Sequence, residues 1–102
     1  MTYFVVVATG RDLEDAWGTA LEEARRGHPD DEHPAGTMAD KHEYVLIDEP
    51  ARPLDEAIDR AVALLDADDD RIVTVWHPAG AVPVSESITG RRAWVLVGWT
   101  HA

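Results

Sequence analysis

The chain has 102 residues and no cysteine, which excludes disulfide frameworks, thiolate metal centres, cysteine nucleophiles and thiol redox switching. It also lacks an apolar run close to the ~20 residues that a membrane-spanning helix needs, and no basic-then-apolar leader opens it. Hydrophobic residues make up 45% of the sequence and charged residues 28%, which is typical of a globular domain. We therefore expect one soluble, cytoplasmic domain over residues 1–102.

Positive charge is scarce, because 9 lysine and arginine residues stand against 20 acidic residues and give a net charge of -11. This balance argues against direct binding to nucleic acid or to an anionic membrane. Residues 12–70 hold 19 of the 20 acidic residues but only five of the bases. Two interpretations stay open. The acids provide a well-hydrated surface, as in adaptation to high salt, or they form an electrostatic surface that attracts a basic partner.

Hydrophobic periodicity predicts two helices among several strands. In the first helix, apolar residues recur at helical spacing from Leu13 to Ala24, and Asp12 is a natural N-cap. In the second, Pro53 suits the first helical position. In chain order we expect a strand at 2–8, a helix at 13–26, a polar loop at 27–42 with a short edge strand at 36–40, a strand at 43–48, a helix at 53–66, a strand at 71–77, a connection at 78–90 and a strand at 93–100.

This order predicts an α+β fold, a two-layer sandwich with the ferredoxin-like β-α-β-β-α-β order and one extra C-terminal strand. Two helices on one face leave the other face open, although the first and last strands are apolar at nearly every position. Trp76, Trp94 and Trp99 lie on predicted strands and are candidate interface aromatics. Either the 78–90 connection or another subunit, as in a homodimer, then covers the open face.

The loop at 27–42 contains histidines among carboxylates, which are ligands for zinc and related metals. His28, His33 and His42 are the candidate ligands, but their spacing matches no short metal-binding signature. We expect a solvated loop and no bound metal or cofactor, and a small metal-binding domain stays as an alternative.

No pattern in the chain indicates catalysis. Ser85, Ser87, Thr89 and His77 are the candidate nucleophiles and base, and no Gly-x-Ser-x-Gly elbow accompanies them. Thr9-Gly10-Arg11 lacks the further glycines of a dinucleotide-binding turn. We expect a protein that is not an enzyme and has no catalytic residues.

Acidic side chains gather on the outer faces of the two predicted helices. We expect them to form two ridges that a basic groove of a partner would contact. The candidate partner-binding residues are Asp12, Glu14, Asp15, Glu22 and Glu23 on the first ridge, and Asp55, Glu56, Asp59, Asp66, Asp68, Asp69 and Asp70 on the second.

Residues 27–42 carry a Gly27-His28 pair followed by Gly36-Thr37-Met38 and Lys41. This segment resembles one in small bacterial and phage-associated proteins, where a Gly-His pair precedes a Tyr-x-Gly-Thr-Ile run. The chain departs from that pattern because it lacks the tyrosine and has Met38 in place of isoleucine. The resemblance implies a phage or mobile-element context and no particular activity.

These observations together favour a non-enzymatic acidic interaction protein that docks on a basic, nucleic-acid-handling protein without contacting nucleic acid itself. A phage-type inhibitor, of the anti-CRISPR or DNA-mimic kind, is the specific form that we expect. The alternatives are the metal-binding domain centred on His28, His33 and His42 and a homo-oligomeric structural domain.

Overall fold

A computed structural model describes residues 2–26, 38 and 41–100 of the chain. The elements are the strands β1 (Thr2–Gly10), β2 (Tyr44–Leu46), β3 (Ala79–Ile88) and β4 (Arg91–Thr100) and the helices α1 (Leu13–Arg26) and α2 (Leu54–Asp66). The strands form one mixed sheet in the order β1-β4-β3-β2. β4 pairs antiparallel with β1 and with β3, and β2 pairs parallel with β3. The α+β class is therefore confirmed.

The predicted ferredoxin-like order with an extra strand is wrong. It required a strand at 71–77, but these residues form turns and bends, and the strand lies instead in the predicted connection, at Ala79–Ile88. The strand lies at 79–88 because its small residues fit closely against the core. A Cβ on Gly80 would lie 3.2–3.3 Å from side-chain atoms of Ile72, Ile47 and Val97. Ile72 instead anchors its turn in the core, where it is 1% exposed. The predicted edge strand at 36–40 lies outside the described residues apart from Met38.

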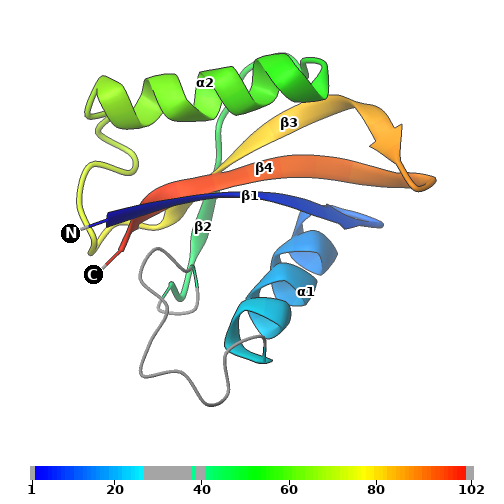
Figure 1. Cartoon of the computed structure of the whole chain (residues 1–102), viewed down its shortest axis with the longest axis horizontal. Helices are drawn as coiled ribbons and strands as arrows, with labels where there is room; N and C mark the ends of the chain where they lie inside the picture. Colours follow the sequence, from blue (N-terminus) through cyan, green and yellow to red (C-terminus); the bar gives the residue numbers. More distant parts are fainter. Residues whose placement is uncertain (1, 27–37, 39–40, 101–102) are drawn as a thin grey trace.

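Each face of the sheet carries one helix, and in Figure 1 the sheet lies between α1 and α2. Alternation along the strands produces this division, because successive side chains point to opposite faces. In β4, Trp94 and Leu96 pack in the α1 cluster, whereas Val95 and Val97 pack in the α2 cluster. The open face expected from the sequence is thus covered in part by α2, whereas residues 79–88 of the predicted connection form a strand of the sheet itself.

Both predicted helices are confirmed, and each begins at an N-terminus capped by a carboxylate. The Asp15 N–H donates to Asp12 Oδ1 at 2.8 Å, as expected of an N-cap. In α2 the residue before the helix is Pro53, which has no side-chain hydrogen bond to offer. The Leu54 N–H donates instead to Glu86 Oε1 at 2.6 Å, so a carboxylate from β3 caps α2. No helix of the described residues is long and apolar enough to cross a membrane.

The C-terminal hairpin turns at Thr89 and Gly90, whose φ angles are 53° and 79°. Positive φ at both central residues is the pattern of a type I′ turn, which matches the twist of antiparallel strands. Ile88 and Arg91 close the turn as a cross-strand pair. The antiparallel hairpin expected at the end of the chain is therefore present, and its first strand is β3.

Candidate functional site

The two acidic ridges predicted from the sequence lie on opposite sides of the sheet, because α1 and α2 pack in different core clusters. A single basic groove therefore cannot contact them side by side. On α1, the acids are Asp12, Glu14, Asp15, Glu22 and Glu23, and all but the half-buried Asp15 are exposed.

Arginines partly neutralise the ridge on α1. Asp15 Oδ2 lies 3.7 Å from Arg11 Nε and 3.2 Å from Arg91 Nη2, and Glu22 pairs with Arg26 one helical turn later. The Arg11 backbone N–H donates to Asp15 Oδ2 at 2.9 Å and is the main cause that lowers the pKa of this carboxyl group. The α1 ridge thus keeps fewer uncompensated carboxylates than its acid count suggests.

On the α2 side, two half-buried carboxylates hold the neighbouring arginines. Glu49 accepts bonds from Arg60 Nε and Nη2 at 2.9 and 2.7 Å and from Arg52 Nη1 at 2.7 Å. These bonds, that of Arg60 first, lower the pKa of Glu49 to about 2. Asp69 binds the guanidinium of Arg71 through both carboxylate oxygens, each at 2.9 Å, which lowers the pKa of Asp69 to about 2. Asp69 is therefore an ion-pair residue, and the prediction that it belongs to the docking ridge is not supported by its contacts.

The remaining acids of this side are exposed, and no arginine or lysine of the described residues forms an ion pair with them. We call this set the α2 acidic surface. Its residues are Asp55, Glu56, Asp59, Asp66, Asp68 and Asp70. Arg52 and Arg60 are bound to Glu49, and Arg71 is bound to Asp69, so this surface keeps its negative charge.

The three candidate interface tryptophans lie in three different environments. Trp94 is 5% exposed in the α1 cluster, with the Arg92 guanidinium carbon 5.1 Å from its ring centroid. Trp99 is half-buried and meets the Tyr3 ring edge-on at a centroid distance of 6.1 Å. Trp76 lies in the turn before β3 and is 83% exposed. The prediction that Trp76 lies on a strand is therefore wrong, and Trp94 is too buried to serve as an exposed interface aromatic.

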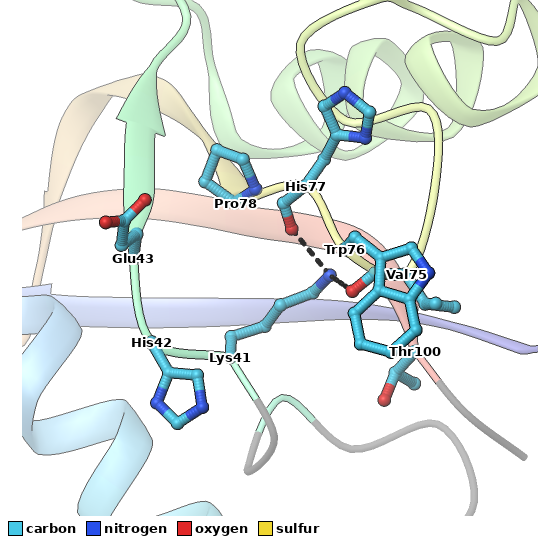
Figure 2. A pocket seen from close by; sticks show the side chains of 8 residues that line it. All are labelled: Lys41, His42, Glu43, Val75, Trp76, His77, Pro78 and Thr100. Atoms are coloured by element: carbon cyan, nitrogen blue, oxygen red, sulfur yellow. Dashed lines mark hydrogen bonds between the residues drawn. The ribbon is translucent and has the colours of Figure 1, made fainter.

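A pocket of about 320 Å³ opens beside Trp76 and is shown in Figure 2. Lys41 crosses it and donates from Nζ to the backbone oxygens of Val75 and His77 at 2.9 and 2.8 Å. Lys41 is only 4% exposed, so its ammonium group fixes the turn before β3. The pocket is lined by Lys41, His42, Glu43, Val75, Trp76, His77, Pro78 and Thr100.

The candidate nucleophiles and base do not come together among the described residues, and His42 is the one candidate metal ligand that these residues include. The rings of His42 and His77 point in different directions in Figure 2, and His77 Nδ1 lies 2.7 Å from Thr74 Oγ1. Ser85 and Ser87 lie toward the far end of β3, about 20 Å or more along the strand from its first residue, Ala79, which follows the turn that holds His77. No cluster of three histidine, aspartate or glutamate side chains occurs in this part of the chain. His28 and His33 lie outside the described residues.

The sequence analysis missed Tyr3, Val7 and Val62, which are 53%, 41% and 41% exposed. Their apolar character predicted burial. Tyr3 and Val7 are exposed because β1 lies at the edge of the sheet, and Val62 lies on α2. It also missed the buried Lys41, for which the sequence offers no signal beyond its being the only lysine.

The chain matches no protein-family model, no curated protein and no solved structure. Of residues 27–42, only Met38, Lys41 and His42 lie within the described residues, so the resemblance to phage-associated proteins stays a prediction. The contacts above therefore carry the functional argument.

Proposed function

We propose that the chain is a non-enzymatic interaction protein that docks on a basic protein partner through the α2 acidic surface. The observation that carries this proposal is that some carboxylates around α2 bind arginines whereas the others stay exposed and unpaired among the described residues. Glu49 and Asp69 bind the local arginines, and six exposed carboxylates are left without a described counter-ion. A surface of one charge sign steers an oppositely charged partner and repels polyanions.

The partner chemistry follows from the sign and spacing of these charges. Asp55, Asp59 and Asp66 recur along one side of α2, so a partner with lysine or arginine at comparable intervals is complementary to them. Proteins that bind nucleic acid carry such basic surfaces, and they are the partner class that we propose. The two ridges lie on opposite faces of the sheet, so they do not support an inhibitor that fills one groove with both of them. The proposal is therefore limited to docking through α2.

Two matched variants test the proposal, since each removes three negative charges without adding bulk. Asp55→Asn/Glu56→Gln/Asp59→Asn changes the α2 acidic surface, and Glu14→Gln/Glu22→Gln/Glu23→Gln changes the opposite face. Binding of the wild type and both variants is measured by biolayer interferometry to the basic protein that crosslinks to the wild type in a native extract. We expect the α2 variant to lose at least tenfold in affinity at about 50 mM salt, the α1 variant to keep it, and about 1 M salt to abolish the difference.

Equal affinities of the two variants, or binding that is unchanged at about 1 M salt, would contradict the proposal. Competition with duplex DNA tests the partner class, because a nucleic-acid-handling partner releases the chain when DNA occupies its basic surface. The alternative is that the acidic residues only keep the surface hydrated. In that case the chain unfolds at low salt, gains stability up to molar salt and crosslinks to no basic protein.

A further inference from the structure

Helix α2 covers only part of its face of the sheet. It packs mainly on β3 and β4, whereas the edge strand β1 presents Tyr3, Val5 and Val7 on the same face. Tyr3 is 53% exposed and Val7 is 41% exposed, with the half-buried Val5 between them. Strand β1 has no charged residue and no proline between Thr2 and Gly10, so it lacks the devices that usually protect an exposed edge strand.

The contact of Arg60 shows which side of α2 faces β1. Arg60 binds Glu49, which follows β2 at the opposite edge of the sheet. Each residue turns an α-helix by about 100°, so Val62 lies about 200° around from Arg60, on the side of β1. Val62 is 41% exposed, which agrees with this position. We name Tyr3, Val5, Val7 and Val62 the β1–α2 strip.

Acidic residues border this strip. By the same helical rotation, Asp55, Asp59 and Asp66 lie within about 60° of Val62, and all three are exposed. The N-terminus of α2 lies near the end of β3 through the bond from Leu54 to Glu86, so α2 runs antiparallel to β1 beside the strip. The strip is therefore an apolar surface with a row of carboxylates along one side.

We propose that the β1–α2 strip binds an amphipathic helix of the partner, which has lysine or arginine residues along one border of its apolar face. The inference rests on the proposed function and specifies the partner element. Packed helices lie 8–10 Å apart and neighbouring strands about 4.8 Å apart, so a helix beside α2 lies about two strands away, over β1. Its apolar side chains contact Tyr3, Val7 and Val62, and its basic side chains reach the carboxylates of α2.

Charge distinguishes this occupant from a second copy of the chain. A copy seated on the strip with its own α2 would place two acidic helices next to each other, and each chain carries a net charge of -11. Like charges that face each other oppose association, whereas a basic helix is attracted by the same row of carboxylates.

The experiment uses a fluorescent 18-residue peptide of leucine, lysine and alanine with an apolar face and a lysine border. A scrambled peptide of the same composition serves as its control, and binding is measured by anisotropy at about 50 mM and about 1 M salt. Val7→Thr/Val62→Gln removes apolar contacts without changing charge, with Leu46→Thr, 49% exposed in the wild type on β2, as the matched control. Asp59→Asn/Asp66→Asn removes two bordering charges, with Glu14→Gln/Glu23→Gln on α1 as the matched control.

We expect the amphipathic peptide to bind at least tenfold more tightly than the scrambled one. Val7→Thr/Val62→Gln weakens this binding about tenfold at both salt concentrations, because each lost apolar contact reduces the buried area. Asp59→Asn/Asp66→Asn weakens it about fivefold at low salt alone. Both controls stay within twofold of the wild type, and circular dichroism confirms that every variant is folded.

Other outcomes separate the inference from the proposed function. Equal binding of both peptides, lost in Asp59→Asn/Asp66→Asn, overturns the helix site and leaves docking through α2 intact. Equal effects of Glu14→Gln/Glu23→Gln and Asp59→Asn/Asp66→Asn place the binding elsewhere and overturn the inference. Self-association that Val7→Thr/Val62→Gln abolishes in light scattering assigns the strip to a second copy instead. No binding of either peptide overturns the helix site, whereas the proposed function is decided by the binding of the crosslinked basic protein to the two charge variants.

Discussion

The carboxylate of Glu49 links the segment after β2 to α2, and its removal tests whether this link stabilises the fold. Glu49 is 19% exposed and holds Arg60 and Arg52, which are 33% and 32% exposed at their side chains. The substitution Glu49→Gln keeps the shape of the side chain and an oxygen acceptor but removes the charge. The exposed neighbour Asp48 supplies the control Asp48→Asn, which removes the same charge without a described ion pair.

The magnitude follows from the pKa of Glu49, which is about 2 in the folded chain instead of 4.5. That difference corresponds to at most about 3 kcal/mol of stability at neutral pH. Since both arginines are about one-third exposed, solvent screening reduces the expected contribution to about 1–2 kcal/mol. The folded-state pKa lies below the unfolded value, so this stabilisation is complete above about pH 5 and is lost as the pH falls through 4.5 toward 2.

Urea unfolding of the wild type, Glu49→Gln and Asp48→Asn at pH 7 and pH 3 measures the effect. We expect Glu49→Gln to lower the free energy of unfolding by about 1–2 kcal/mol at pH 7 and by less than half as much at pH 3. Asp48→Asn stays within about 0.5 kcal/mol of the wild type at both values. Equal stabilities of Glu49→Gln and the wild type at pH 7, or a difference as large at pH 3, would refute the reasoning.

Three further predictions concern the backbone and the buried lysine, each measured by thermal or urea unfolding. Thr89→Asn raises the free energy of unfolding by about 0.5–1 kcal/mol, because its φ of 53° is unfavourable for a β-branched residue; an unchanged value would contradict the type I′ turn. Gly10→Ala lowers the free energy of unfolding by about 2 kcal/mol or more, since its Cβ would lie 2.6 Å from the Ala16 backbone nitrogen. Gly18→Ala has open space around it and raises the free energy of unfolding by up to about 1 kcal/mol. Opposite signs are the decisive result for this pair. Lys41→Met destabilises by about 2 kcal/mol because two backbone oxygens lose their donor, and no loss would show that the ammonium group does not hold the turn before β3.

Sequence alone predicted the local elements where periodicity and capping agreed. Both helices had complete apolar stripes, the Asp12 cap was located correctly, and α2 begins at Leu54, one residue after the predicted start at Pro53. Strand β3 was missed because Ala79–Ile88 contains glycine, proline and two serines, while the apolar alternation at 71–77 looked more like a strand. Tertiary packing determined which segment became the strand, since the small residues of β3, such as Gly80, fit against the core where larger ones would not.

The candidate site was predictable in its composition and unpredictable in its arrangement. Exposure of the acidic residues followed from their positions on amphipathic helices. Which face each helix covers depends on the chain crossings between strands, so the separation of the two ridges could not be read from periodicity. The pairing of Asp69 with Arg71, two residues apart in a turn, depends on local backbone geometry and was likewise missed. The apolar residues of β1 were assigned to the core because nothing in their order reveals an edge position.

The central place of β4 has a consequence for how the molecule reaches its fold during synthesis. Among the described residues β1 has no strand neighbour except β4, which lies about ninety residues later in the sequence. A nascent chain therefore leaves the valine-rich strand β1 unpaired until residues 91–100 have left the ribosome, and only then can β1 join the sheet. Contacts of such wide sequence separation slow folding, and an unpaired apolar strand is prone to pair with other chains until its partner strand arrives.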